Sequence, residues 1–505
     1  MSKENLLTRI SKMSEDEREN LAYNTSNVEI LNILADDESM FVREDVARNK
    51  NTPVTILTKL AKDRYQYIRC SVATNKNIPP ETLTQLAEDE ANDVRIAVAE
   101  SKNTPAKTLI LLAKDENGGV RWVVAENINT PPEILALLAK DEKGYVRRAV
   151  AKNINTPAET FALLAKDENG NIRWAVAKNI NTPPEILAQL AEDEDNGVRR
   201  AVAKSENSPV ELLSVLAQDE DYTVRCAVAE NKNAPVELLT ALAKDDEWCV
   251  REAVAKNENT SADVLAMLAK DEDRDVRIAV ANNRNTPANI LTMLAQDKDA
   301  NVRSEVAANE NTSVDVLVML ASDKEGWVRQ AVALNGNTPV DALFALATNK
   351  EECVRCEVVK NENAPIKLLA MLSQDKHWLV RETVALNERI SSEVLVALSK
   401  DKEERIRGAV ASNENTPIET LDLLANDEDH RVRKAVARNE NAPADILTTL
   451  AQDKSAYIRY EVAKNPNTPY KTLVMLSHDT EFWVGKNAKK LLREHKKKEK
   501  NSIER

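Results

Sequence analysis

Residues 153–173 read NINTPAETFALLAKDENGNIR, and close copies of this stretch recur through almost the whole chain. The arginine that ends it, Arg173, serves as a landmark. It returns every 26 residues without an insertion, at Arg43, Arg69, Arg95, Arg121, Arg147, Arg173, Arg199, Arg225, Arg251, Arg277, Arg303, Arg329, Arg355, Arg381, Arg407, Arg433 and Arg459. A fixed period of this length indicates a solenoid, in which each repeat buries its apolar face only by stacking on its neighbours.

Each repeat begins with signals for a helix. Thr156 is placed as an N-cap, Pro157 at the first helical position and Glu159 as the acid that completes a capping box. In the preceding repeat, Leu135 and Leu138 have the spacing of one apolar helix face. We therefore expect the first helix of each repeat to have about three turns.

A second helix follows a short turn that contains Asp167. Ile172 and Val176 lie on one side of this helix, together with the landmark Arg173. The run ends at an Asn-x-Asn sequence, and asparagine can adopt the left-handed conformation that often ends a helix. Two helices therefore fill each repeat.

The repeats share a pattern: an Asp six residues before the Arg of Val-Arg-x-x-Val-Ala, then Asn-x-Asn-Thr-Pro and Leu-x-x-Leu-Ala. This pattern resembles the leucine-rich repeat variant family, and its Asp-to-Arg spacing is similar to that of HEAT-like repeats. The match covers approximately residues 20–490. We expect an all-α, right-handed α-solenoid of about 18 two-helix repeats. Members of the variant family can carry an N-terminal iron–sulfur cluster on cysteines, but the first cysteine here is Cys70, so the resemblance implies no cofactor.

The unbroken period predicts one elongated domain instead of several globular ones. Residues 1–34 are expected to form an N-terminal cap and a degenerate half repeat, with a capping box over residues 14–17. Residues 35–484 form the tandem repeats of a single solenoid. Residues 485–505 form a C-terminal capping helix with a basic tail, since residues 486–505 hold nine lysines or arginines against three acidic residues.

The formal net charge is −14, with basic residues mixed among acidic ones. This disfavours nonspecific binding to nucleic acids or membranes. No apolar stretch is long enough to span a membrane, and the five cysteines have no framework spacing, which is typical of a reduced, cytoplasmic protein. We expect a monomer in the cytoplasm.

The row of 17 arginines could be taken for a phosphate-binding spine, but a structural role fits better. Each arginine can pair with the aspartate six residues upstream and with carbonyls of the turn. The sequence also predicts no enzyme, because the four histidines are scattered and no glycine-rich phosphate loop is present. Cys353 and Cys356 with His377 supply only three ligands, so no metal site is expected.

Partner binding is expected where the repeats differ, on the second helix opposite its buried side. We predict an aromatic and basic segment, an apolar segment and a basic segment, the last at Arg405, Arg431, Lys434 and Arg438. The candidate partner-binding residues are Trp122, Tyr145, Arg148, Lys152, Trp174, Lys178, Arg200, Lys204, Trp327 and Leu379. Exposed aromatic residues are typical interface anchors, although they could also fill shallow grooves between repeats.

Two kinds of partner remain open. The favoured one is a protein of unknown identity, extended or helical, held along a groove lined by the second helices. The alternative is a nucleic acid or another polyanion, because alternating aromatic and basic residues also suit stacking on bases and contacts to phosphates.

Overall fold

The computed structural model describes the backbone of residues 3–503 and the side chains of residues 6–494. Over this range the chain forms 38 α-helices and no strand, which confirms the expected all-α solenoid of paired helices. No helix in the described range is long and apolar enough to cross a membrane. The helices form two compact units, Met1–Thr260 and Ser261–Arg505. The boundaries expected at residues 34 and 484 stay predictions.

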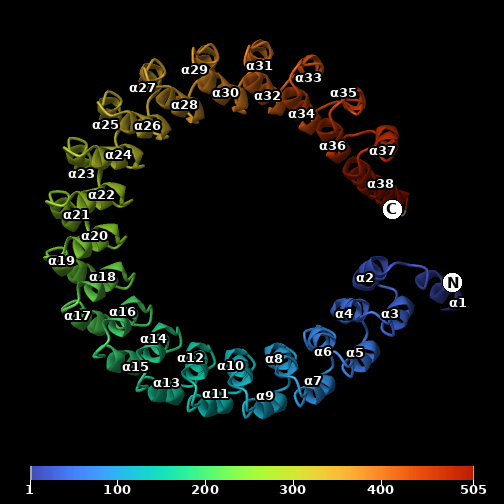
Figure 1. Ribbon diagram of the computed structural model, residues 1–505. Coiled ribbons are helices and arrows are strands. Elements are labelled where there is room, and N and C mark those ends of the chain that lie inside the picture. The colour runs from blue at the N-terminus through green and yellow to red at the C-terminus, as the bar shows by residue number, and fades with distance from the viewer. Residues whose placement is uncertain (1–2, 504–505) are drawn as a thin grey trace. The chain divides into compact units, whose positions relative to one another are not determined.

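In the first unit, the even-numbered helices form an inner row and the odd-numbered ones an outer row (Figure 1). The unit begins with α1 (Lys3–Ile10) and α2 (Glu15–Asn24). The outer helices are α3 (Val28–Leu34), α5 (Val54–Leu60), α7 (Pro80–Leu86), α9 (Ala106–Leu112), α11 (Pro132–Leu138), α13 (Ala158–Leu164), α15 (Pro184–Leu190), α17 (Val210–Leu216) and α19 (Val236–Leu242). The inner helices are α4 (Met40–Arg48), α6 (Gln66–Ala73), α8 (Asn92–Glu100), α10 (Gly118–Glu126), α12 (Gly144–Lys152), α14 (Gly170–Lys178), α16 (Asn196–Lys204), α18 (Tyr222–Glu230) and α20 (Trp248–Lys256).

The second unit repeats this arrangement. Its outer helices are α21 (Ala262–Leu268), α23 (Ala288–Leu294), α25 (Val314–Leu320), α27 (Val340–Leu346), α29 (Ile366–Leu372), α31 (Ser392–Leu398), α33 (Ile418–Ala425), α35 (Ala444–Leu450) and α37 (Tyr470–Leu476). Its inner helices are α22 (Arg274–Asn282), α24 (Ala300–Ala308), α26 (Gly326–Leu334), α28 (Glu352–Lys360), α30 (Trp378–Leu386), α32 (Glu404–Ser412), α34 (His430–Arg438), α36 (Ala456–Lys464) and α38 (Phe482–Ile503). The side chains of the basic tail beyond residue 494 lie outside the described residues.

The core is built from the expected apolar positions, but the first helices are shorter than expected. Leu135, Leu138 and Val150 are almost fully buried. The outer helix α13 has only seven residues, about two turns, because it starts after Pro157. The expected cap at Thr156 is wrong: its hydroxyl donates instead to the carbonyl of Val150 at 2.6 Å, which anchors the linker to the inner helix. The capping box at Ser14 and Glu17 is confirmed.

The asparagine after each inner helix also has a different role from the expected one. Asn153 has φ −68° and ψ 131°, so it is extended and not left-handed. Its side-chain amide nitrogen donates to the carbonyls of Ala125 and Asn127 in the preceding repeat, at 2.8 and 3.1 Å. Its side-chain oxygen accepts a hydrogen bond from the Asn155 N–H. Asparagine is therefore needed here to hold adjacent repeats together, because it satisfies carbonyls that the helix leaves free.

The landmark arginine links two repeats. These contacts fit the structural role that the sequence predicts, but the prediction of its carboxylate partner is wrong. Arg147 donates through Nη1 to the backbone carbonyl of Asp141, six residues upstream, at 2.8 Å. Its Nε and Nη2 donate to the carboxylate of Asp167, 20 residues downstream, at 2.6 and 3.1 Å. That carboxylate also accepts from the Asn169 N–H in its own turn. Each arginine therefore fixes the position of the following repeat through a paired, partly desolvated bridge.

The bridge extends further than the landmark row and has one break. Arg18, which lies 25 residues before Arg43 and so outside the strict period, makes the same contacts with Asp37. At the other exception, Asn349 stands where the bridging aspartate is expected. Arg329 then pairs through Nη2 with Glu351 at 3.0 Å, and its Nε is buried without a hydrogen-bond partner. Leaving a charged donor unpaired costs stability at this joint.

We expect Asn349→Asp to strengthen the joint between α26 and α28. Restoring the carboxylate should raise the local free energy of unfolding by about 1–3 kcal/mol, because Arg329 Nε regains its acceptor. Hydrogen exchange of these two helices measures this, since stability in a solenoid is local. The matched control is Asp323→Asn, which removes the negative charge and one of the two acceptor oxygens opposite Arg303, and it should reduce protection in α24 and α26. Unchanged or lower protection in the Asn349→Asp protein would contradict the bridge as a stabilising contact.

Acid is expected to weaken many of the bridges together. Burial alone would raise the pKa of Asp167, but hydrogen bonds from Arg147 and from the Asn169 N–H hold this pKa below its ordinary value of 3.8. The same balance lowers the pKa of Asp63, Asp89, Asp115, Asp141, Asp193, Asp245, Asp297, Asp323, Asp375, Asp401, Asp427 and Asp453.

A carboxyl group whose folded pKa is lowered contributes stability that is complete above the unfolded pKa and is lost as pH falls through the folded pKa. We therefore expect the melting temperature to change little between about pH 6 and pH 4 and to fall steeply below about pH 4. Thermal unfolding followed by circular dichroism at a series of pH values tests this. A fall that is already complete above about pH 5 would point to other groups.

Candidate binding groove

The inner helices of the first unit present a narrower face than the sequence predicts. On α12, Tyr145, Arg148 and Lys152 are exposed, as expected. Helix geometry predicts that the residue two after the landmark arginine lies on this exposed face as well, but where this residue is alanine, as at Ala149 and Ala201, it is buried. These small residues lie where neighbouring inner helices pack side by side. They form the floor between helices, and the longer side chains form walls.

Three hollows follow one another across α10, α12, α14 and α16, and we call them together the groove. The first is lined by Trp122, Glu126, Tyr145, Arg148, Ala149 and Lys152. The second is lined by Arg148, Gly170, Asn171, Trp174, Asp195 and Gly197. The third is lined by Trp174, Lys178, Ile180, Arg200, Ala201, Lys204, Ser205, Glu206 and Asn207. Arg148 lines the first and second hollows and Trp174 the second and third, so neighbouring hollows are adjacent.

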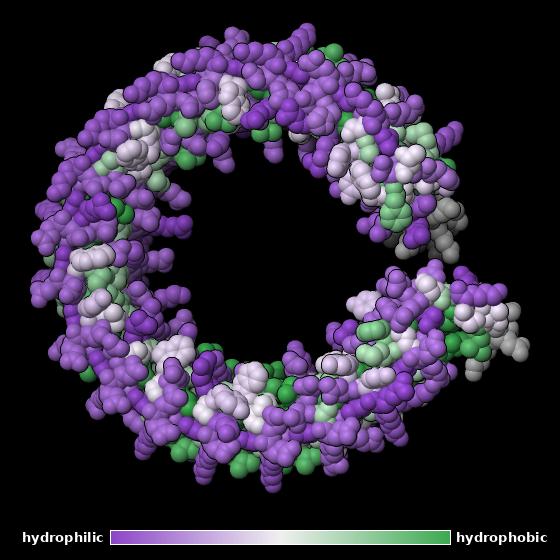
Figure 2. Space-filling view, viewed as in Figure 1, coloured by the Kyte–Doolittle hydropathy of each residue, from purple (hydrophilic) through white to green (hydrophobic). Residues whose placement is uncertain are grey.

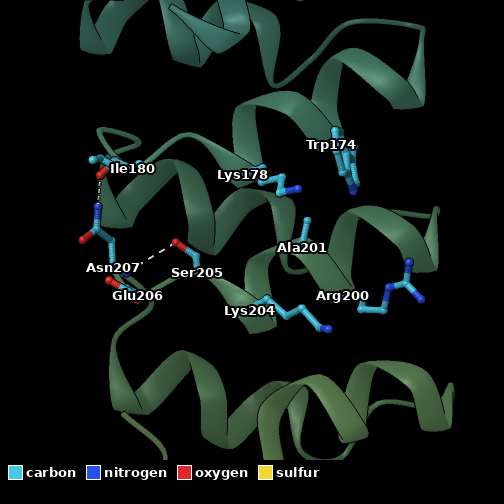
Figure 3. A pocket seen from close by; sticks show the side chains of 9 residues that line it. All are labelled: Trp174, Lys178, Ile180, Arg200, Ala201, Lys204, Ser205, Glu206 and Asn207. Carbon is cyan, nitrogen blue, oxygen red and sulfur yellow. Dashed lines mark hydrogen bonds between the residues drawn. The ribbon is translucent and has the colours of Figure 1, made fainter. Parts of the chain in front are cut away.

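The third hollow shows how the side chains are arranged (Figure 3). Trp174 and Arg200 lie at one end of neighbouring helices, and Lys178 and Lys204 lie further along the same helices. Ile180 comes from the loop after α14 and lies at the other end. The hollow has a volume of about 580 Å³, which is within the range of ligand pockets.

Glycines open the walls of the groove. Gly118, Gly144, Gly170 and Gly197 all lie in the first turns of these four helices. A Cβ atom at Gly118 would collide with the hydroxyl of Tyr145, which lies against the start of α10. The chain has only nine glycines, so this concentration was a sequence signal for the groove that the prediction missed.

The cations of the groove are largely unpaired. The ammonium group of Lys178 lies 4.9 Å from the centre of the Trp174 ring. Lys204 pairs with Glu230 at 2.8 Å. Among the described residues, Arg148, Lys152 and Arg200 have no carboxylate within 4.0 Å. Their charge is therefore available to a ligand.

The prediction from the sequence also missed a row of exposed isoleucines along one edge of the groove. Ile128, Ile154 and Ile180 are 55%, 55% and 72% exposed. Each holds the position seven residues after the landmark arginine. In most other repeats this position is charged, at Lys50, Lys76, Lys102, Glu206, Lys232, Glu258, Arg284, Glu310, Glu362, Glu388, Glu414 and Glu440. Figure 2 shows apolar side chains among polar ones on this inner side of the first unit.

Comparison with known proteins identifies the repeat. The family model described as leucine rich repeat variant matches residues 222–247 and 430–455, one repeat in each unit. The resemblance to the leucine-rich repeat variant family is confirmed. No curated protein matches the chain.

Two solved structures are similar to this chain. A leucine-rich repeat variant with a novel repetitive structural motif is 29% identical over 44% of this chain and 87% of that one, with a TM-score of 0.35. Importin beta is 12% identical over 94% of this chain and 72% of that one, with a TM-score of 0.31. With TM-scores this low, neither structure says what this chain binds.

The predicted apolar segment lies in the second unit. Trp327 on α26 is 50% exposed, and Leu334 and Leu386 are exposed to a similar extent. Leu379 on α30 is half-buried. The helix α28 separates the repeats of Trp327 and Leu379, so the prediction that they share one binding surface stays untested.

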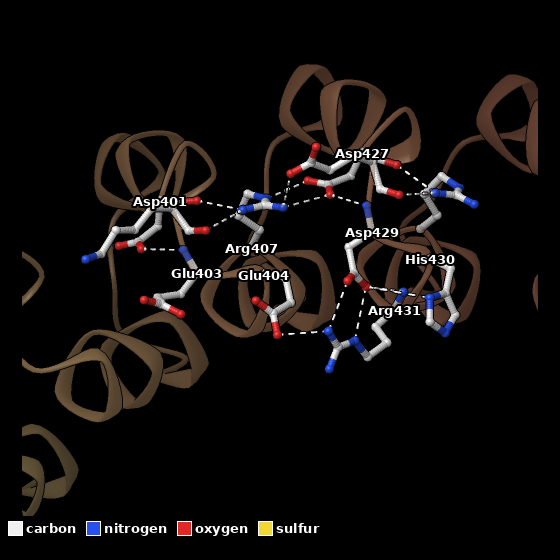
Figure 4. Close-up of polar contacts among 11 residues, drawn as sticks. Asp401, Glu403, Glu404, Arg407, Asp427, Asp429, His430 and Arg431 are labelled. Atoms are coloured by element: carbon white, nitrogen blue, oxygen red, sulfur yellow. Dashed lines mark hydrogen bonds and ion pairs between the residues drawn. The ribbon is translucent and has the colours of Figure 1, made fainter.

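In the predicted basic segment, three of the four cations pair with carboxylates of the chain, and the fourth, Arg405, lies 5.1 Å from the centre of the Trp378 ring. Arg431 pairs with Glu404 at 2.9 Å and with Asp429 at 3.0 Å (Figure 4). The hydrogen bond from Arg431 lowers the pKa of Asp429 to about 2. Lys434 and Arg438 both pair with the buried carboxylate of Glu461, at 3.6 and 2.8 Å. These variant repeats therefore use their cations to join neighbouring inner helices.

Cys356, one of the two cysteines of the Cys-x-x-Cys sequence, and the nearby His377 make separate local contacts. Cys356 is buried, its sulfur accepts from the Thr383 hydroxyl at 3.7 Å, and burial raises the pKa of its thiol. His377 instead caps α30, where its Nδ1 accepts from the Leu379 N–H at 3.3 Å. The described residues contain no group of three or more potential ligands placed to hold a metal ion.

Proposed function

We propose that this leucine-rich repeat variant chain is a non-enzymatic scaffold and that the groove binds an extended or helical segment of a protein partner. The observation that carries the proposal is the unpaired charge of Arg148, Lys152 and Arg200 in adjacent hollows, beside the exposed rings of Trp122 and Tyr145 and the half-buried ring of Trp174. In the basic segment of the second unit, Arg431 and Arg438 instead pair with carboxylates of the chain, and Arg405 lies over the ring of Trp378.

The chemistry of the groove is that of a protein interface. Tryptophan and tyrosine supply large contact areas at little entropic cost, and arginine adds charge-assisted hydrogen bonds, so these residues dominate many binding energies. Trp122, Tyr145 and Arg148 line one hollow, and Trp174 and Arg200 line another. A partner that reaches both hollows would meet two anchor sites.

A polyanion such as a single-stranded nucleic acid is the second candidate. Aromatic rings next to cations favour it, since bases stack on such rings while phosphates contact the cations. Acidic residues weigh against it: Glu126 lines the first hollow, Asp195 the second and Glu206 the third. A ligand with a phosphate at every position would meet each of these carboxylates.

The double variant Trp122→Ala and Trp174→Ala tests the groove. We expect it to weaken the main partner by about 2–4 kcal/mol, the range of interface hot spots, with an unchanged melting temperature. The partner is first captured from the native host, and its affinity is then measured by calorimetry. Trp248→Ala is the matched control, because Trp248 is 43% exposed on α20 outside the groove. If the double variant binds every captured partner as tightly as the unchanged protein, the groove is not the interface.

Reversing charge separates the two candidates. For a polyanion, binding should fall steeply with salt and be abolished by Arg148→Glu with Arg200→Glu. A protein partner should keep a salt-resistant component that depends on Trp122 and Trp174. Nuclease treatment of the captured material gives an independent control.

A further inference from the structure

The three hollows are similar in construction, and this similarity restricts the ligand. Each has one aromatic wall and one wall that carries an arginine. In the first hollow Trp122 faces Arg148 and Lys152, and in the third Trp174 faces Arg200 and Lys204. The floors are small residues, Ala149 and Ala201. Each hollow can therefore take an apolar side chain against the ring, with an acidic group beside it.

The spacing of the hollows indicates how those side chains follow one another. The first hollow lies between α10 and α12 and the third between α14 and α16, so they are two repeats apart, about 16–20 Å at the usual spacing of packed helices. An extended chain in the polyproline II conformation advances about 9 Å in three residues, and every third side chain points the same way. Side chains at positions i and i+6 of such a chain are therefore spaced to enter the first and third hollows, and the side chain at i+3 lies between them, near Arg148 and Trp174 of the second hollow.

The two residues between successive apolar anchors face the cations. Arg148, Lys152 and Arg200 are exposed and have no carboxylate partner among the described residues. Acidic side chains at the intervening positions would complement them. A segment with two acids in every three residues also disfavours a helix, because like charges four residues apart repel, and it favours an extended chain.

We propose that the groove binds an acidic peptide segment in an extended, polyproline II-like conformation, with an apolar side chain at every third position. This inference rests on the proposed function and specifies its partner. The edge isoleucines add to the fit: Ile180 closes one end of the third hollow, so an apolar side chain there contacts both Ile180 and Trp174. The acidic residues at the groove discriminate against a uniform phosphate chain, whereas in the proposed peptide every third residue is apolar and can lie beside Asp195 or Glu206.

The test uses the full chain and fluorescently labelled synthetic peptides, with binding followed by anisotropy. The probe has leucine at every third position and glutamate between. We expect it to bind at least about tenfold more tightly than a peptide of the same composition with its leucines grouped at one end. Equal binding of the two peptides would overturn the proposed spacing.

Variants locate the binding site. Trp174→Ala and, separately, Arg200→Glu should each weaken the probe at least about tenfold. Arg284→Glu is the matched control, because it makes the same charge change at an exposed residue of the second unit. It should change the affinity less than about twofold. If Arg284→Glu weakens the probe as much as Arg200→Glu does, the peptide binds by overall charge and the inference is wrong.

Two competing ligands complete the test. A longer peptide with leucine at every seventh position forms a helix whose apolar residues have the same spacing, since seven residues rise about 10 Å. Tighter binding of this peptide overturns the extended conformation. If oligothymidylate binds more tightly than the peptide probe, and Arg200→Glu abolishes that binding, the ligand is a nucleic acid and the inference is wrong. If no peptide binds but Trp122→Ala with Trp174→Ala still loses the captured partner, this inference fails while the proposed function stands.

Discussion

The bridge from each arginine to the aspartate of the next repeat is the interaction on which the structure depends. Arg147 contacts its own turn through the Asp141 carbonyl and the next repeat through the Asp167 carboxylate. A planar guanidinium with five fixed donors can make both contacts at once, which a lysine could not. The bridge therefore fixes how each turn sits against the next carboxylate and favours a constant repeat length. Arg18 and Asp37 make the same bridge across one residue fewer, so the bridge does not impose the 26-residue period by itself.

Asparagine and threonine complete the joint on the opposite side of the inner helix. Asn153 donates to two carbonyls of the preceding repeat, and Thr156 donates to Val150 in its own. All these groups are buried, and buried polar groups without partners are costly. The repeated polar residues are thus consumed by contacts within the solenoid. Ligand binding is left to the positions at which the repeats differ.

The same distinction separates the two basic regions. In the second unit, Glu461 is buried between Lys434 and Arg438, and Glu404 contacts Arg431 across neighbouring helices. In the groove, the corresponding positions hold mostly alanine and glycine, so Arg148, Lys152 and Arg200 have no carboxylate partner among the described residues and the space between helices stays open. Two regions with similar numbers of basic residues therefore differ in the charge that they offer to a ligand.

The sequence by itself determined the repeat, its two helices, the buried apolar face and the set of exposed aromatic and basic residues, because a short period leaves each unit only one way to bury its leucines. It did not determine which partner each polar residue would find. Arg147 was expected to pair with Asp141 and pairs with Asp167, and Thr156 was expected to cap a helix and anchors a linker. In both cases the acceptor belongs to another element, and only stacking decides which elements meet. The hollows depend on the tertiary structure for the same reason. Trp174 and Arg200 are 26 residues apart, and they line one hollow because Ala201 is small enough to let their helices pack closely.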